Sequence, residues 1–451
     1  METATVVGSG PNGLAAAIVL AQAGVRVTVL EAEDTIGGGA RTQELTLPGF
    51  LHDVCSAIHP MAAASPFFRS LPLAEHGLSW VQPDIPLAHP FDDGSASTIR
   101  RSLDETARLL GEDGPSYKRL MSPVTGHWDD LAPAILGPVL RLPRHPLLMA
   151  RFGLNALQPA TRLAGTVFKE ARTRALFAGM AAHANVPLDG LFTAGTGIVL
   201  GGAAHPFGWP IAAGGSRSIT AALAGYLRSL GGKIDTGRKV ESMSGLNAGA
   251  VLFDLTPRQV LRIAGPHLSQ GYRRALSGYR YGAGAFKVDY ALSGPIPWTA
   301  AECRSAGTVH LGGSIEEIVL SEALIGKGVT PERPFTLVAQ QSLFDSTRAP
   351  DGKQTAWAYC HVPNGSSEDL TDRIEAQIER FAPGFHDLVL ARHVTSVAGL
   401  EAYNENYVGG DIAGGSVEGL QLFFRPARRV SPYTTSDRRL YPSMEEARRN
   451  G

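Results

Sequence analysis

Cysteine is scarce in this 451-residue sequence, and the scarcity excludes several kinds of site. The three cysteines, Cys55, Cys303 and Cys360, lie far apart and form no CxxC pair. Neither a zinc knuckle nor a dithiol redox pair is therefore encoded. An odd number of thiols also argues against a disulfide framework and is typical of a reducing compartment.

The sequence also lacks an excess of charge and any long apolar run. Its 41 basic and 42 acidic residues give a formal net charge of -1, so no basic surface for a nucleic acid is predicted. No run of about 20 apolar residues predicts a transmembrane helix. No basic segment precedes an apolar stretch at the start, so we expect a cytoplasmic protein without a signal peptide. The histidines His361, His386 and His393 are scattered, and no metal site is predicted.

What is present is the composition of a folded globular protein. Hydrophobic residues make up 44% and charged residues 18%, and the length predicts two or three lobes. Lysine occurs at only seven positions beside abundant alanine and glycine, which indicates the coding bias of a GC-rich bacterial gene.

The first 31 residues have the pattern of a βαβ unit. A β-branched run over 3–7 predicts a buried strand, residues 12–23 predict a helix that Gly24 ends, and residues 25–30 predict a second strand. Between the first strand and the helix stands Gly8-Ser9-Gly10-Pro11-Asn12-Gly13, a G-x-G-x-x-G motif. Its glycines permit the turn, the approach of a pyrophosphate and close helix packing, and the helix N-terminus favours the phosphate. A glycine turn without a ligand is the alternative.

Two further features favour FAD over NAD. Glu31 ends the second strand, 18 residues after Gly13, where a carboxylate can bind the ribose hydroxyls of an adenosine. The segment Gly37-Gly38-Gly39-Ala40-Arg41-Thr42 follows, and Arg41 can clamp the pyrophosphate from the opposite side, with Gly38 beside it. A surface arginine in a loop is the other interpretation of Arg41.

Beyond this unit the pattern is mixed. It predicts helices over 104–110, 116–131, 166–182, 218–230 and 372–382, and strands over 233–234, 251–255, 285–292, 336–340 and 355–361. Apolar and polar residues alternate along 285–292, which is typical of a strand with one solvated face. Five prolines divide 131–160 into short helices and turns, and 201–215 and 404–415 are rich in glycine.

The N-terminal block, the segment 210–216 and the segment 403–415 together resemble the phytoene-desaturase-like FAD oxidoreductases. Within that family they are most similar to the branch of pyridine nucleotide-disulfide oxidoreductase domain-containing protein 2, over roughly residues 1–435. The resemblance implies an α/β fold of amine-oxidase-like architecture, with a Rossmann-type FAD-binding domain assembled from separated segments and an inserted α+β substrate lobe. It places 1–75, 195–285 and 395–451 in the FAD-binding domain, and 76–194 and 286–394 in the substrate lobe.

The segment 210–216 is consistent with that implication. Gly214 and Gly215 precede a predicted helix and can bring the backbone close to a flat cofactor, with Ser216 as the candidate N-cap. An ordinary loop-to-helix turn is the alternative.

The resemblance breaks at the C-terminus. Family members carry a Gly-rich turn and a helix that approach the flavin ring, whereas residues 442–451 here predict a short polar helix with a capping box from Ser443 to Glu446. The adenosine and pyrophosphate half of the site is thus expected to be intact. The isoalloxazine half is in doubt, and we expect weak FAD binding that a family-like tail would restore.

Candidate catalytic residues are few, because a flavin supplies the chemistry itself. His52, Asp53 and His59 follow the phosphate clamp and are candidates for flavin contact or proton transfer, with local hydrogen bonding as the alternative. Lys287 is a candidate flavin-site lysine, although its strand pattern places it on a solvated face. The apolar segment 131–154 with Arg141, Arg144 and Arg151 is either a buried lobe element or a lid that contacts a membrane peripherally.

Three functional hypotheses follow. The first is an FAD-dependent oxidoreductase that removes hydride equivalents from an apolar, polyene-like or lipid-like substrate. The second is a truncated, non-catalytic relative that acts through a protein partner. The third is an amine oxidase, which an aromatic cage at the flavin would favour. The sequence determines neither the substrate, nor the electron acceptor, nor the oligomeric state.

Overall fold

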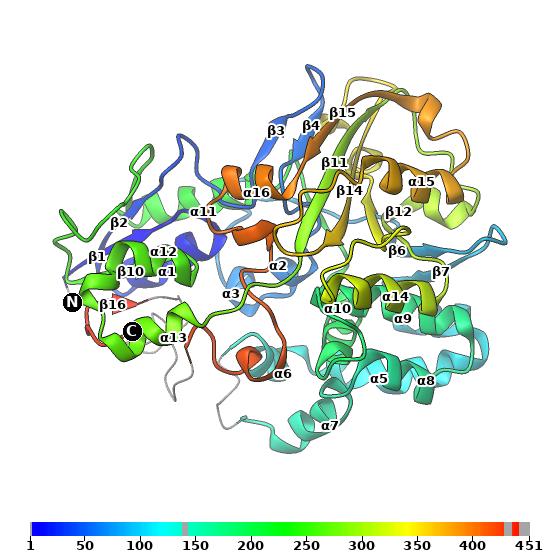
Figure 1. Ribbon diagram of the computed structural model, residues 1–451, viewed down its shortest axis with the longest axis horizontal. Coiled ribbons are helices and arrows are strands. Elements are labelled where there is room, and N and C mark those ends of the chain that lie inside the picture. Colours follow the sequence, from blue (N-terminus) through cyan, green and yellow to red (C-terminus); the bar gives the residue numbers. More distant parts are fainter. Residues whose placement is uncertain (1, 138–142, 428–434, 442–451) are drawn as a thin grey trace.

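The computed structural model describes residues 2–137, 143–427 and 435–441, which form two sheets flanked by helices (Figure 1). The first sheet is entirely parallel and has the strand order β16-β10-β1-β2-β9. Its strands are β1 (Thr3–Val7), β2 (Arg26–Leu30), β9 (Lys233–Asp235), β10 (Ala250–Phe253) and β16 (Leu440–Tyr441).

Helices cover both faces of this parallel sheet. The helices α1 (Pro11–Gln22) and α11 (Arg217–Ser229) pack on one face, and α12 (Pro257–Ala264) and α13 (Gln270–Ser277) pack on the other. Gly24 adopts a φ of 81° directly after the first helix, a conformation that glycine reaches without strain. The predicted βαβ unit is confirmed, and the three layers form a Rossmann-like domain.

The second sheet is mixed and has the order β15-β11-β14-β13-β12-β6-β7. Its strands are β6 (Ile85–Pro90), β7 (Ala96–Ile99), β11 (Gly284–Leu292), β12 (Ala306–Leu311), β13 (Thr336–Ala339), β14 (Gln354–Val362) and β15 (Val389–Thr395). The helix α15 (Thr371–Phe381) covers one face, and a layer of helices covers the other. Every residue of β11 is buried, so the predicted solvated face of this strand is wrong: alternation of polar and apolar residues does not reveal that a second layer covers the polar face.

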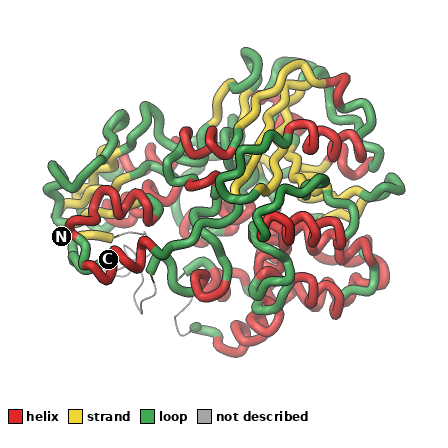
Figure 2. Tube along the Cα trace, viewed as in Figure 1, coloured by secondary structure: helices red, strands yellow, loops and turns green. Residues whose placement is uncertain are grey.

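The helical layer lies below this sheet in Figure 2. It comprises α4 (Leu103–Leu109), α5 (Gly114–Gly126), α6 (Trp128–Ile135), α7 (Pro146–Ala156), α8 (Ala160–Val167), α9 (Ala171–Ala181), α10 (Thr193–Phe207) and α14 (Ile315–Gly326). The helices predicted over 116–131 and 166–182 are each two helices. The second break occurs where the Asp113 carboxylate accepts the N–H groups of Lys169 and Glu170, both at 2.8 Å.

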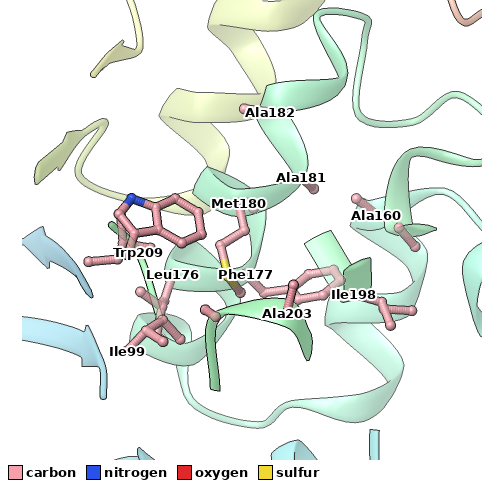
Figure 3. Packing of buried hydrophobic residues seen from close by; sticks show 14 of the residues in the cluster. Ile99, Ala160, Leu176, Phe177, Met180, Ala181, Ala182, Ile198, Ala203 and Trp209 are labelled. Carbon is pink, nitrogen blue, oxygen red and sulfur yellow. The ribbon is translucent and has the colours of Figure 1, made fainter. Parts of the chain in front are cut away.

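The sequence pattern does not predict α10, because this segment is rich in glycine. Those glycines permit close helix contacts: a Cβ at Gly202 would lie 2.5 Å from Val124, and one at Gly197 would lie 3.1 Å from Phe177. Figure 3 shows Ile198 and Ala203 of this helix among Phe177 and neighbouring apolar side chains. Since α10 packs with α5 and α9, it lies in the helical layer; the assignment of 195–285 to the cofactor-binding domain stays a prediction.

Shorter elements join the two sheets. They are β3 (Thr42–Glu44), β4 (Leu51–Asp53), α2 (Pro60–Ala64), α3 (Pro66–Arg69), β5 (Trp80–Val81), β8 (Ile211–Ala212) and α16 (Val397–Tyr403). No helix in the described ranges is long and apolar enough to cross a bilayer. The three cysteines are buried and free. The polar helix and capping box predicted within 442–451 lie outside the described residues, as does Arg141.

Candidate dinucleotide-binding site

A cavity of about 1150 Å³ opens where β1, β2 and β10 end. It is larger than the roughly 300–1,000 Å³ of most small-molecule pockets, as an extended dinucleotide requires. Its walls come from many separate segments of the chain. They include the Gly-rich turn 8–12, residues 30–33, residues 38–41 and residues 402–407.

The Gly-rich turn has the geometry that its motif predicts. Gly8 adopts a φ of 105°, and its N–H donates to the carbonyl of Leu30 at 2.8 Å. A Cβ at Gly13 would lie 2.1 Å from the carbonyl oxygen of Gly8, so only glycine lets α1 pack this closely on the turn. Pro11 opens the helix, and Pro11 and Asn12 both line the cavity.

Asp254 faces this turn, and sequence reasoning missed it. Its Oδ2 accepts the N–H of Gly13 at 2.9 Å, and a Cβ at Gly10 would lie 2.9 Å from the same oxygen. Burial, and to a lesser degree the charge of Glu31, raises the pKa of Asp254 to about 6, although the Gly13 N–H opposes the shift. The available signal was an acidic residue at the carboxyl end of a predicted parallel strand.

Glu31 lines the cavity and is largely buried. Its carboxylate accepts the backbone N–H groups of Ser9 at 3.0 Å and Glu33 at 3.1 Å, and the Ser9 hydroxyl. These hydrogen bonds connect the end of β2 to the Gly-rich turn. The carboxylate also lies in the cavity where ribose binding is predicted.

Arg41 also lines the cavity, but its guanidinium is engaged with protein atoms. Nη2 donates to the carbonyl of Thr35 at 2.7 Å and lies 3.3 Å from Glu31 Oε1. Tyr403 stacks near it, with 5.4 Å between Cζ and the ring centroid, and donates its hydroxyl to the carbonyl of Gly38 at 2.8 Å. Arg41 thus stabilises the loop 35–38 beside the cavity. Its role as a pyrophosphate clamp stays a prediction.

Gly214 and Gly215 are not brought to this cavity. The N–H of Gly214 donates to Asp345 Oδ2 at 2.8 Å, and a Cβ at Gly215 would lie 2.3 Å from the hydroxyl of Thr42. Ser216 stands at the N-cap of α11, but its side chain makes no capping bond. The Asp53 carboxylate instead accepts the N–H of Ser216 at 2.8 Å. Both glycines make contacts within the fold and do not line this cavity, and their approach to a flat cofactor stays a prediction.

His59 lines the cavity and His52 does not. Burial lowers the pKa of His59 to about 4, so the ring is neutral near pH 7. The Ser216 hydroxyl donates to the carbonyl of Ser56 and lies 2.8 Å from His59 Nε2, so Nε2 is the nitrogen that carries the proton. His59 Nδ1 is then an acceptor.

His52 belongs to a buried charged cluster between the two sheets. Burial first, and then the charges of Lys287 and Arg348, lower the pKa of His52 to about 3. Its Nδ1 lies 3.7 Å from Asp289 Oδ1, and Asp53 pairs with Arg348 at 2.6 Å. This cluster holds β4 against the second sheet.

Lys287 is buried on β11, and its predicted solvated position is wrong. Its ammonium pairs with Asp289 and lies 6.0 Å from the ring centroid of Trp357. Burial raises the pKa of Asp289 to about 6 against the attraction of Lys287. Lys287 does not line the cavity that contains the Gly-rich turn.

The residues fit a dinucleotide at the adenosine and pyrophosphate end. A glycine turn that a Cβ would fill, a helix N-terminus and a carboxylate at the end of β2 meet there. We refer to the part of the cavity that is lined by Gly39, Ala40, His59, Tyr403 and Tyr407 as its inner end; sequence reasoning missed the two tyrosines. No group of potential metal ligands occurs among the described residues.

Comparison with known proteins agrees with this geometry. The NAD(P)-binding Rossmann-like domain family matches residues 6–71. Pyridine nucleotide-disulfide oxidoreductase domain-containing protein 2 of Rattus norvegicus is 25% identical over 525 residues, which cover 97% of this chain and 88% of that protein. A limonene dehydrogenase subunit of Castellaniella defragrans is 29% identical over 110 residues, which cover 24% of this chain and 20% of that protein.

The fold is also shared with solved structures. A redesigned triple mutant of putrescine oxidase has a TM-score of 0.60 at 17% identity, over 99% of this chain and 96% of its own. The predicted fold class is confirmed: a mixed α/β protein with a Rossmann-like dinucleotide-binding domain, similar in structure to flavin amine oxidases.

Replacing Glu31 by alanine is expected to weaken dinucleotide binding. The change removes a charged acceptor and frees the Ser9 N–H, which costs about 1.5–3 kcal/mol of binding free energy. Fluorescence titration with FAD measures the dissociation constant. Glu75→Ala, at an exposed residue that does not line the cavity, is the control and leaves the dissociation constant unchanged; equal affinity for both variants would mean that Glu31 does not hold the ribose.

Proposed function

We propose that this chain is an FAD-dependent oxidoreductase that removes hydride equivalents from its substrate. The observation that carries the proposal is the extent of the cavity. The Gly-rich turn, Glu31, Arg41, His59 and Tyr407 line one cavity of about 1150 Å³, which offers room for a flavin in addition to the adenosine and pyrophosphate.

The residues would divide the cofactor among them. The turn 8–13 and the N-terminus of α1 would hold the pyrophosphate, and Glu31 the ribose. FAD, when bound, supplies the hydride acceptor. His59 is a neutral imidazole whose acceptor nitrogen Nδ1 lies 3.4 Å from Ser56 Oγ, and it is a candidate to contact the flavin or to accept a proton.

For the substrate we favour an apolar, polyene-like or lipid-like molecule. Apolar side chains line part of the cavity, among them Phe67, Phe68, Leu136 and Ile412. The similarity to a limonene dehydrogenase, whose name states an apolar terpene, supports the same class. An amine is the second candidate, because Tyr403 and Tyr407 flank the inner end and putrescine oxidase shares the fold.

In the presence of added FAD, the chain is expected to bind the flavin and to show its absorbance bands. Cofactor released by heat should run as FAD in chromatography. Anaerobic mixing with limonene should then bleach the oxidised flavin band, because the flavin accepts the hydride. Bleaching by putrescine and not by limonene would favour the amine oxidase. A folded, colourless chain that takes up no added FAD would favour a non-catalytic relative that acts through a protein partner.

We further propose that α7 contacts an anionic lipid surface. Leu147 and Leu154 are 87% and 74% exposed and lie two helical turns apart on this helix. Arg144 and Arg151 are exposed beside them. Exposed leucines flanked by cations are typical of a helix that lies in a membrane interface.

The double variant Leu147→Asp/Leu154→Asp is expected to lose cosedimentation with phosphatidylglycerol vesicles, because carboxylates resist entry into the lipid interface. Leu320→Asp, at a 59% exposed position on α14, is the matched control and should still cosediment with the vesicles. Absence of vesicle binding by the wild-type chain would contradict the proposal and leave α7 as an ordinary lobe element.

A further inference from the structure

The carboxylate of Asp254 lies at the mouth of the Gly-rich turn. It follows β10, and its Oδ2 accepts the N–H of Gly13 at 2.9 Å. A Cβ at either Gly10 or Gly13 would lie 2.9 Å from that oxygen. The two glycines therefore leave room for an acidic oxygen at the place where a pyrophosphate would meet the N-terminus of α1.

An ionised Asp254 is poorly compensated there. Several other charged side chains line the cavity, namely Glu31, Glu33, Arg41, Arg238, Lys239, Arg262, Glu405 and Arg425. Arg41 is bound to Glu31 and to carbonyls of the loop 35–38. Lys239 and Arg262 pair with Glu405, and Arg425 donates to the carbonyl of Gly415. Within the described ranges no lysine or arginine pairs with Asp254, and Glu31 repels it.

We propose that Asp254 binds the pyrophosphate of the cofactor as a carboxylic acid, so that dinucleotide binding takes up one proton. Oδ2 keeps the N–H of Gly13, while Oδ1 takes a proton from solvent and donates it in a hydrogen bond to a phosphate oxygen. An ionised carboxylate would instead place a third negative charge beside the two phosphates. The inference rests on the proposed function where it names FAD as the ligand.

The pH dependence follows from this proton. Burial and Glu31 place the pKa of Asp254 at about 6 in the free protein, and the bound phosphates raise it further. Because the complex holds more protons than the free protein, affinity is greatest below about pH 6 and falls as pH rises, by up to about tenfold per unit.

The test is calorimetric titration of the full chain with FAD between about pH 5.5 and 8, in two buffers of different ionisation enthalpy. ADP-ribose serves as a second ligand, because its pyrophosphate, like that of FAD, is a diester that does not titrate in this range. Adenosine has no phosphate and should bind without proton uptake. We expect close to one proton taken up per FAD near pH 7 and an affinity at least about tenfold weaker at pH 8 than at pH 6.

Substitutions of Asp254 test whether this residue takes up the proton. In Asp254→Asn the amide oxygen can accept from Gly13 while the amide NH₂ donates to phosphate, so we expect pH-independent affinity and tighter binding than wild type at pH 8. Asp254→Ser should also lose the pH dependence, which keeps the test valid if the asparagine variant fails to fold. Asp235→Asn, at the exposed end of β9, should retain the wild-type profile.

A flat wild-type profile without proton uptake would overturn the inference. Persistence of the pH dependence in Asp254→Asn would also overturn it, because the proton would then belong to another group. Uptake with ADP-ribose but no binding of FAD would support the role of Asp254 and contradict the proposed flavoenzyme. Failure of both ligands to bind the folded wild-type chain would contradict both proposals.

Discussion

Replacing Gly10 by valine is expected to abolish dinucleotide binding. The new Cβ would lie 2.9 Å from Asp254 Oδ2, and its methyl groups would occupy the space through which a pyrophosphate approaches the turn. The loss should exceed about a hundredfold in affinity, or about 2.8 kcal/mol. Titration with FAD or ADP-ribose measures it.

The matched control is Gly165→Val. Gly165 lies on α8, where a Cβ would have no neighbour within 4 Å, so this substitution changes helix propensity without filling a site. The affinity of the Gly165→Val variant for FAD should equal that of the wild type. Binding by Gly10→Val within a few-fold of wild type would reject the phosphate site.

Removing the guanidinium of Arg348 is expected to destabilise the fold strongly. Arg348 is fully buried and pairs with Asp53 at 2.6 Å. Burial alone would raise the pKa of Asp53, but Arg348 together with the donors of Ser216 and Thr42 holds it below its usual value. Arg348→Ala leaves that carboxylate buried without its cation, which costs about 3–5 kcal/mol of unfolding free energy.

Chemical denaturation of the variant measures this cost. The double variant Asp53→Leu/Arg348→Met removes both charges and should be more stable than Arg348→Ala alone, because no unpaired charge is left buried. Arg172→Ala breaks an exposed pair with Asp93 and should leave the midpoint unchanged. A wild-type midpoint in Arg348→Ala would show that Asp53 does not depend on its partner.

The pairing also positions the inner end of the cavity. Asp53 accepts the N–H of Ser216 at 2.8 Å, and the Ser216 hydroxyl lies 2.8 Å from His59. A change at Arg348, which lies between β13 and β14 in the chain, therefore reaches the proposed flavin end through two hydrogen bonds. No spacing in the sequence indicates this connection, since Asp53 and Arg348 are 295 residues apart.

Sequence reasoning failed at Lys287 and at α10 for different physical reasons. Lys287 alternates with apolar neighbours, and the sequence contains no information on β4, whose His52 lies against that face; Asp289 compensates the charge of Lys287 in the interior. The glycines of α10 have a low helix propensity, so the sequence pattern does not predict a helix there. The close contacts with α5 and α9 that these glycines permit outweigh that low propensity.

The sequence by itself determined the βαβ unit, the Gly-rich turn and the position of Glu31. All lie within residues 3–31, so local periodicity and the conformational freedom of glycine are sufficient to specify them. Only the tertiary structure decided the rest of the site. It brought Asp254 to that turn and Tyr403 and Tyr407 to Gly38 and Gly39 in the same cavity. It also placed Gly214 and Gly215 against a carboxylate and a threonine. These positions depend on how distant segments pack and on which buried charges must find partners.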